Sequence, residues 1–219
     1  MYNTCEQMKK HSVIKSTKIC DPQLRPEDIG SAIPRRGSKI SQTLAQRMMS
    51  LFRWQIKGSV PNLPKMILIG APHTSNWDFI LTIGAMFALG VQFNWLAKDS
   101  MFRNPFGRAF RYLGGIGVNR SQSNNLVSAV VSEFQQRESI LLAIMPEGTR
   151  TKVKRWKTGF YYMAMQAKVP ILLITFDYGR KILKIGPIIT PTGDIETDLP
   201  HIQAHYQNVK GKNPDKYGS

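Results

Sequence analysis

The sequence is poor in cysteine and carries no recognisable export signal. Its two cysteines, Cys5 and Cys20, form no metal-binding spacing, so free thiols in a cytoplasmic protein are the expectation. No apolar segment follows the N-terminal lysines, and we therefore expect no secretory signal peptide. The longest uncharged stretch, residues 79–97, is divided by Gly90. Because a membrane-spanning helix needs about 20 mostly apolar residues, we also expect no transmembrane span.

Acidic residues are scarce as well. Fourteen Asp and Glu stand against thirty Lys and Arg, which gives a formal net charge of +16 at pH 7. This balance implies an anionic partner, which can be nucleic acid, a membrane surface or an acidic carrier protein. The sequence contains neither a Walker A motif nor a Gly-x-Ser-x-Gly motif. Their absence argues against a phosphate-loop nucleotide site and against a Ser-His-Asp hydrolase.

Alternating strand-like and helix-like segments predict an α/β fold with a mainly parallel sheet flanked by helices. Residues 1–40 show no helical or strand period and are expected to form a poorly ordered basic arm. Residues 41–57 are predicted to form an amphipathic helix and a first strand, and residues 54–219 the catalytic domain. We expect strands over residues 54–57, 66–70, 93–97, 139–144, 169–176 and 181–185, the first two being neighbours and the last two paired across a turn. Helices are expected over residues 75–89, 124–137 and 160–167, followed by a modest terminal helix.

The helix predicted to begin near Ser41 is amphipathic and basic. Leu44, Met48 and Leu51 recur at helical spacing, with Arg47 among them. Such a helix can lie in a lipid interface with its cations facing anionic headgroups, or it can pack its apolar stripe on the domain core. Both alternatives stay open at this point.

The polar stretch from His73 to Asp78 directly follows the apolar run of residues 66–70. His73 should therefore emerge at the carboxyl end of a buried strand, where open α/β sheets place their ligand sites. Ser75 with Asp78 three residues later fits a capping box, and a strand-to-helix turn there can bring His73 and Asp78 together. The carboxylate would then orient a histidine that acts as a general base. Alternatively, Asp78 is only the capping acid and His73 an ordinary loop histidine.

A second polar cluster follows the strand predicted for residues 139–144. Carboxyl ends of parallel strands meet at one edge of a sheet, so Glu147 and Arg150 are expected near His73. Guanidinium groups match phosphate oxygens bidentately, and Arg120 and Arg150 therefore suggest a phosphorylated acceptor. The alternatives are an ion pair between Arg150 and Glu147 and a solvated Arg120.

Other charged and metal-binding residue types give weaker signals. Lys98, Lys152 and Lys157 can add contacts to a phosphate, although charge runs more often form a solvated face. His201 and His205 have the spacing of zinc ligands on a helix, but no carboxylate motif accompanies them. We expect no metal site.

Four motifs, in this order, resemble those of the glycerolipid acyltransferase family, which includes 1-acylglycerol-3-phosphate acyltransferases. The resemblance covers about residues 50–190. Met145 stands where an aromatic residue usually precedes the third motif, and Thr151 where serine often follows it. The motifs are the His-x4-Asp block His73-Thr74-Ser75-Asn76-Trp77-Asp78, the block Gly117-Val118-Asn119-Arg120, the block Pro146-Glu147-Gly148-Thr149-Arg150 and the block Val169-Pro170-Ile171.

The resemblance implies transfer of a fatty acyl group from acyl-CoA or acyl-carrier protein to the hydroxyl of 1-acylglycerol-3-phosphate (lysophosphatidate), giving phosphatidate. It implies no cofactor, no metal and no acyl-enzyme. His73 would be the base that deprotonates the acceptor hydroxyl, and Asp78 its orienting partner. The acceptor phosphate would be bound by Arg120, Glu147, Gly148, Thr149 and Arg150, with Lys98 and Lys157 as auxiliary contacts.

The resemblance also gives the positive charge a reason. Lysophosphatidate lies in anionic bilayers, so peripheral attachment to the membrane surface from the cytoplasm is expected, with residues 54–219 as the acyltransferase domain. Nucleic acid is not expected as a partner. The alternatives are another lyso-lipid or glycerol phosphate as acceptor, an inactive basic module that binds lipid or nucleic acid, and a hydrolase in which His73 activates water.

Overall fold

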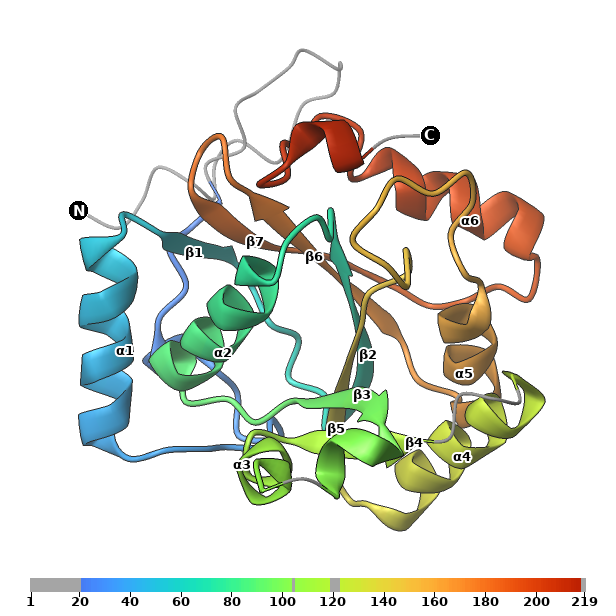
Figure 1. Cartoon of the computed structure of the whole chain (residues 1–219), viewed down its shortest axis with the longest axis horizontal. Coiled ribbons are helices and arrows are strands. Elements are labelled where there is room, and N and C mark those ends of the chain that lie inside the picture. The colour runs from blue at the N-terminus through green and yellow to red at the C-terminus, as the bar shows by residue number, and fades with distance from the viewer. Residues whose placement is uncertain (1–20, 104, 119–122, 218–219) are drawn as a thin grey trace, which may run out of the picture.

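The computed structural model describes residues 21–103, 105–118 and 123–217. These residues form a seven-stranded sheet covered by helices on both faces (Figure 1), which confirms the predicted fold class. The strands are β1 (Gln55–Gly58), β2 (Lys65–Ala71), β3 (Asn94–Lys98), β4 (Gly115–Val118), β5 (Ile140–Ile144), β6 (Ile171–Asp177) and β7 (Ile182–Ile189). The α-helices are α1 (Lys39–Leu51), α2 (Trp77–Leu89), α3 (Gly107–Tyr112), α4 (Ser123–Gln136), α5 (Gly159–Ala167) and α6 (Ile195–Ala204). Short 3-10 helices are η2 (Pro26–Asp28), η3 (Asp99–Phe102) and η4 (Pro214–Lys216).

The strand order places β2 in the middle of the sheet. The order is β1-β7-β6-β2-β5-β3-β4, and every neighbouring pair is parallel except β6 and β7, which are antiparallel as predicted. The expectation that residues 54–57 and 66–70 form neighbouring strands is wrong, because β7 and β6 lie between β1 and β2. Strand β4 was not predicted, since its glycines give little strand signal and it is held by pairing with β3 at the sheet edge. The carboxyl ends of β2 and β5 lie side by side.

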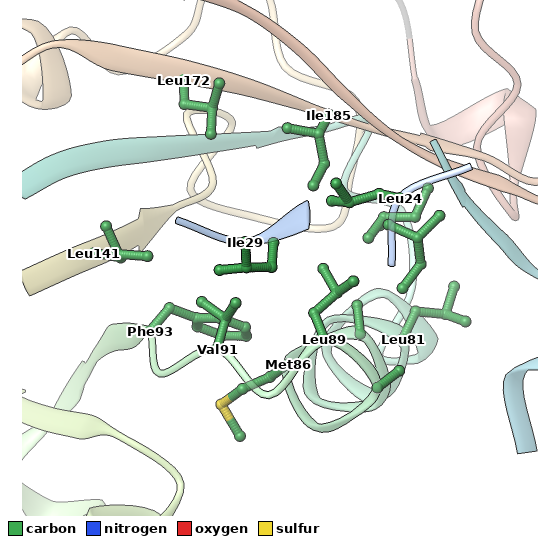
Figure 2. Close-up of a cluster of buried hydrophobic side chains, with 14 of the residues drawn as sticks. Leu24, Ile29, Leu81, Met86, Leu89, Val91, Phe93, Leu141, Leu172 and Ile185 are labelled. Atoms are coloured by element: carbon green, nitrogen blue, oxygen red, sulfur yellow. The ribbon is translucent and has the colours of Figure 1, made fainter. Parts of the chain in front are cut away.

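Alternate side chains of β2 enter two separate hydrophobic cores, one on each face of the sheet. Met66 and Leu68 pack with α2 in the first core, which Figure 2 shows between that helix and the strands. Ile67 and Ile69 pack with α4, α5 and α6 in the second core. This is the pattern of a sheet buried on both faces.

Residues 21–38 differ from the expected poorly ordered arm. Leu24, Ile29 and Ile33 are buried in the first core, and the N–H of Leu24 donates to the carbonyl of Ile56 at 2.9 Å. These apolar residues enter the first core at irregular spacing. Because they follow no helical or strand period, the sequence pattern did not predict their burial. Residues 1–20 of the expected arm lie outside the described residues.

Helix α1 lies beside α2 and runs antiparallel to it (Figure 1). Most of its apolar side chains are exposed. Its N-cap is Ser38, three residues before the cap predicted at Ser41. Met49 is buried, whereas Leu44 is 62% and Leu51 74% exposed. The apolar stripe therefore does not pack on the core of the described protein. Within that part of the chain no helix has both the length and the apolarity needed to cross a bilayer.

Candidate active site

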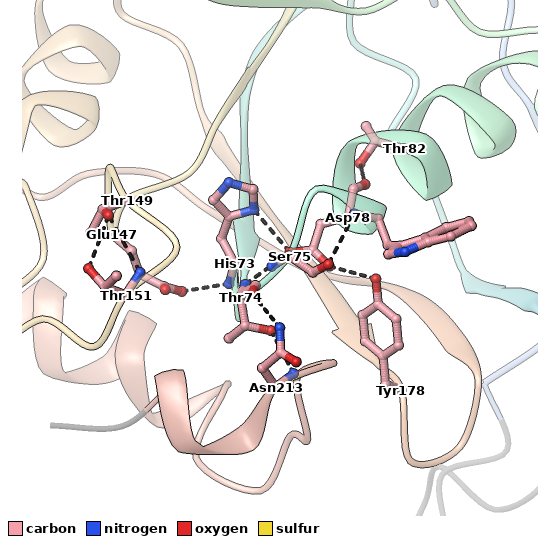
Figure 3. Close-up of polar contacts among 11 residues, drawn as sticks. His73, Thr74, Ser75, Asp78, Thr82, Glu147, Thr149, Thr151, Tyr178 and Asn213 are labelled. Carbon is pink, nitrogen blue, oxygen red and sulfur yellow. Dashed lines mark hydrogen bonds and ion pairs between the residues drawn. The ribbon is translucent and has the colours of Figure 1, made fainter.

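The turn between β2 and α2 folds His73 back onto Asp78. The Nδ1 atom of His73 lies 3.0 Å from Oδ2 of Asp78 (Figure 3), which is the juxtaposition that the capping-turn spacing predicts. Asp78 is fully buried, while the His73 side chain keeps 12% of its surface exposed. Its Nε2 atom has no hydrogen-bond partner among the residues that the structure describes. Nε2 is thus the nitrogen that can take a proton from a bound molecule.

Asp78 serves the helix start and the histidine at once. Its Oδ2 also accepts the backbone N–H groups of Thr74 at 2.9 Å and Ser75 at 3.0 Å. Asp78 therefore contacts His73 and also accepts backbone N–H groups just before α2. The helix begins slightly later than predicted, because the N-cap position is Asn76 and the Ser75 hydroxyl accepts from the N–H of Trp77 at 3.2 Å.

Glu147 ties the end of β5 to the histidine loop. Its Oε1 accepts the backbone N–H of His73 at 2.8 Å, and the residue is 2% exposed (Figure 3). Burial raises the pKa of the Glu147 carboxyl, and this outweighs the lowering by the His73 hydrogen bond. A buried carboxylate repels phosphate, so this geometry suits a residue that fixes the loop better than one that touches an anion.

Gly148 and Lys157 lie against each other beside that loop. Gly148 has φ +67°, in the left-handed region that favours glycine, and a Cβ there would meet the Lys157 Cδ and Cε atoms at 2.9 Å. The backbone N–H of Lys157 donates to the carbonyl of Pro146 at 2.8 Å. The sequence between Pro146 and Lys157 thus forms a closed loop that returns the lysine to Gly148.

The remaining predicted ligands are less closely placed. Thr149 shares a hydrogen bond with Thr151 rather than with the dyad. Arg150 is exposed and, in the described part of the chain, forms no ion pair with Glu147. Lys98 is exposed at the carboxyl end of β3, on the same sheet edge. Arg120 lies outside the described residues.

The predicted zinc spacing does not lead to a metal centre. Within residues 21–103, 105–118 and 123–217, no group of three or more His, Cys, Asp or Glu side chains is arranged so that it could hold a metal ion. His201 lies on α6 and is exposed, whereas His205 is its C-cap and packs its Nε2 atom against Gly186. The two histidines are therefore in different environments.

A narrow apolar cavity lies between α2 and the sheet, and its lining includes neither His73 nor Asp78. Its volume is about 70 Å³, room for roughly five water-sized groups. Three of its lining residues come from the segments that carry the site: Gly70 on β2, Thr82 one turn after Asp78, and Met145 just before the Glu147 loop. A larger cleft of about 810 Å³ lies between α1 and residues 23–27, and His73, Asp78 and Glu147 are not among its lining residues.

Two contacts that sequence reasoning missed hold the histidine loop from distant parts of the chain. The hydroxyl of Tyr178 donates to Oδ1 of Asp78 at 2.6 Å. The Asn213 side chain donates to the carbonyl of Thr74 at 2.8 Å, and its backbone N–H donates to the Thr74 hydroxyl at 3.1 Å (Figure 3). Neither residue belongs to a motif, and more than ninety positions separate each from its partner, so no local spacing could have found them.

Comparison with known proteins places the chain in a family. The sequence profile of the Acyltransferase family matches residues 53–177, more than half of the 219 residues. A segment of 85 residues is 36% identical to human 1-acyl-sn-glycerol-3-phosphate acyltransferase beta, covering 36% of this chain and 30% of the human protein. The crystal structure of the 1-acyl-sn-glycerophosphate (LPA) acyltransferase PlsC from Thermotoga maritima matches with a TM-score of 0.55 over 76% of this chain and 75% of that chain, at 20% identity, which is a likeness of fold. With its profile match spanning His73, Asp78 and Glu147, the chain belongs to the acyltransferase family.

Proposed function

We propose that this protein transfers a fatty acyl group from acyl-CoA or acyl-carrier protein to the free hydroxyl of 1-acylglycerol-3-phosphate. The observation that carries the proposal is the unbonded Nε2 of His73, whose ring is oriented by the contact of Nδ1 with Asp78. Family membership and the human relative's name favour the same acceptor class. The proposed reaction uses neither a metal nor a prosthetic group.

The proposed reaction uses the unbonded Nε2 atom of His73 as the base. As the acceptor oxygen attacks the thioester carbonyl carbon, Nε2 of His73 takes the hydroxyl proton and the imidazolium is stabilised by Asp78. The new carbon–oxygen bond forms and the carbon–sulfur bond breaks. The proton on His73 then passes to the departing thiolate, which leaves as a thiol. No bond forms between the protein and the acyl group.

Cations around the loop after β5 would hold the acceptor phosphate. Lys157 lies against Gly148, and Arg150 extends from the same loop into solvent. Lys98, at the end of β3, and Arg120, which lies outside the described residues, complete the proposed set. Glu147 contributes by fixing the His73 backbone, because its carboxylate is already engaged with that N–H. A net charge of +16 favours the approach of both the acceptor and an anionic donor.

The apolar cavity would take the acyl chain. Its wall exposes almost only apolar surface, which suits a hydrocarbon and excludes water from the thioester. At about 70 Å³ it holds only the first part of a fatty chain. Met86 and Met145 line it, and unbranched methionine side chains can move to admit a longer chain.

The direct test is transfer of radiolabelled acyl groups from each donor to lysophosphatidate by purified protein. Replacing His73 by Ala should lower the rate by about 10²- to 10⁴-fold, the usual contribution of a general base, while circular dichroism shows an unchanged fold. The matched control is His201→Ala, which removes an exposed histidine and should leave the rate intact. Undiminished transfer by a folded His73→Ala protein would contradict the mechanism. An acceptor screen read by mass spectrometry separates lysophosphatidate from other lyso-lipids and glycerol phosphate, and no turnover with any acceptor would favour a binding module.

The proposed function includes attachment to an anionic bilayer through α1. Ile40, Leu44 and Leu51 are between 62% and 82% exposed and share one side of the helix. Trp77 and Ile80 at the start of α2 are also about half exposed. Because α1 runs antiparallel to α2, its apolar stripe extends toward the end of α2 that carries the dyad. A bilayer that accepts this stripe would deliver its lipid acceptor beside the catalytic loop.

Vesicle flotation measures the attachment. The double variant Leu44→Ser/Leu51→Ser should bind phosphatidylglycerol vesicles at least about tenfold more weakly, since fully burying one leucine contributes roughly 1.5–3 kcal/mol. Met165→Ser is the control, because Met165 is an exposed apolar residue on α5, across the sheet. Equal flotation of the double variant and the wild-type protein would remove α1 as the anchor.

A further inference from the structure

The two oxygens of the Asp78 carboxylate have different partners. Oδ2 faces Nδ1 of His73 and two backbone N–H groups. Oδ1 accepts the hydroxyl of Tyr178 at 2.6 Å, and among the described residues this is its only side-chain donor. Tyr178 lies in the turn between β6 and β7, 100 residues after Asp78 and just beyond the segment that matches the family profile.

We propose that Tyr178 is a positioning residue for the acyl transfer, which holds the Asp78 carboxylate in the rotation that aims Oδ2 at His73. This inference rests on the proposed function. A carboxylate turns readily about its Cβ–Cγ bond, because rotation of such a terminal group is only weakly restricted. A donor on each oxygen fixes that rotation, and with it the direction of the His73 Nε2 atom.

Tyr178 is itself held rigidly enough for this task. Its ring packs edge-on against Trp54, with the ring centroids 4.9 Å apart and the planes at 85°. Its backbone N–H donates to the carbonyl of Lys210 at 2.9 Å. Burial, followed by the hydrogen bond to Asp78, raises the pKa of the Tyr178 hydroxyl. The group therefore stays protonated and remains a donor throughout the neutral pH range.

The position of the hydroxyl excludes a direct part in the chemistry. Figure 3 shows Tyr178 and His73 on opposite sides of the Asp78 carboxylate. The acceptor hydroxyl must approach Nε2, which is separated from Tyr178 by both the imidazole ring and the carboxylate. Tyr178 thus acts through Asp78, and its removal should change the rate of the chemical step more than the binding of either substrate.

Tyr178→Phe tests this, because it removes one oxygen and keeps the ring against Trp54. We expect kcat to fall about tenfold with KM within about twofold, as small misplacements of a catalytic group do. The chain offers a matched control in Tyr161→Phe. The Tyr161 hydroxyl donates to Oδ2 of Asp198 at 2.7 Å, also in a buried setting but on the other face of the sheet. That variant should lose stability and keep kcat.

A double-mutant cycle shows whether the effect passes through Asp78. In an Asp78→Asn background, Tyr178→Phe should change kcat by less than about twofold, because the carboxylate that it positions is gone. A further tenfold loss in that background would show that Tyr178 acts by another route and would overturn the proposal.

A spectroscopic readout decides the matter without turnover. In 15N-histidine spectra, the Nδ1 resonance identified by its loss in His73→Ala should shift in Tyr178→Phe and stay in place in Tyr161→Phe. A wild-type protein that transfers no acyl group refutes the proposed function, and the Nδ1 shift still decides whether Tyr178 positions His73. An unchanged Nδ1 resonance in Tyr178→Phe overturns the inference, whether or not kcat falls.

Discussion

The two faces of the sheet each bury an aspartate that accepts a tyrosine hydroxyl. Asp78, at the start of α2, is bonded by Tyr178, and Asp198, on α6, is bonded by Tyr161. Both carboxylates also accept a backbone N–H group. Asp78 in addition lies 3.0 Å from a histidine ring nitrogen, a contact that Asp198 lacks within the described residues. A buried carboxylate whose oxygens all accept hydrogen bonds is therefore an ordinary structural feature. It becomes a candidate catalytic feature when one of its donors is a histidine whose other ring nitrogen is free to accept a proton.

The surroundings of the two aspartates differ in the same sense. One helical turn after Asp78, Thr82 lines an apolar cavity together with other residues of α2 and the sheet. Asp198 instead accepts both the backbone N–H and the hydroxyl of Thr192, at 2.8 and 3.0 Å, and so closes the loop before α6. Asp78 thus orients a histidine one helical turn from the cavity wall, whereas Asp198 fastens one part of the chain to another.

The largest expected difference is in activity. Asp78→Asn should lower acyl transfer by about 10²-fold or more, because an amide cannot stabilise the imidazolium as a carboxylate does. Asparagine is also a good capping residue, so an Asp78 that only caps α2 would leave the rate almost unchanged. Asp198→Asn makes the same chemical change on the other face and should leave the rate near the wild-type value. Initial rates at saturating substrate measure the activity of both variants. If the two variants lose the same activity, Asp78 has no special part in catalysis.

A smaller difference is expected from filling space on each face. Ala85 on α2 lines the cavity, whereas Ala164 on α5 is equally buried in the second core. Ala85→Leu should lower transfer of palmitoyl groups about tenfold relative to octanoyl groups, because the added side chain occupies the path of the longer chain. Ala164→Leu should cost about 1–3 kcal/mol of stability, as overpacking does, without changing that preference. If Ala85→Leu leaves the chain-length preference unchanged, the cavity does not bind the acyl chain.

Local spacing predicted the part of the site that lies at strand ends. Asp78 lies five positions after His73. A strand-to-helix turn over so short an interval brings the two side chains close together. Glu147 was expected nearby because parallel strands bring their carboxyl ends to one edge, and its bond to the His73 backbone has that origin. Both inferences rest on short-range geometry that the sequence carries directly.

Long-range contacts left no comparable signal. Tyr178 reaches Asp78 only because β6 lies beside β2, and Asn213 reaches Thr74 from the far end of the chain. The burial of Leu24 and Ile29 likewise depends on the finished surface of α2 and the sheet, not on any period in residues 21–38. Sequence reasoning therefore located the candidate reactive groups and missed the residues that hold them in place.

The smallest expected difference concerns stability and pH. The backbone N–H of Thr192 and then the Tyr161 hydroxyl hold the pKa of Asp198 below its ordinary value of 3.8. The folded protein thus favours the charged carboxylate more than the unfolded chain does, so this contribution is complete above about pH 3.8 and is lost as the pH falls through the lowered folded-state pKa. Asp198→Asn should be less stable than wild type by about 1–2 kcal/mol at neutral pH, and urea unfolding should show the gap closing in acid. If the difference in free energy of unfolding between the two proteins stays constant down to pH 3, the charge of Asp198 does not contribute to stability. Asp198 would then differ from Asp78 in its part in catalysis and not in the effect of its charge.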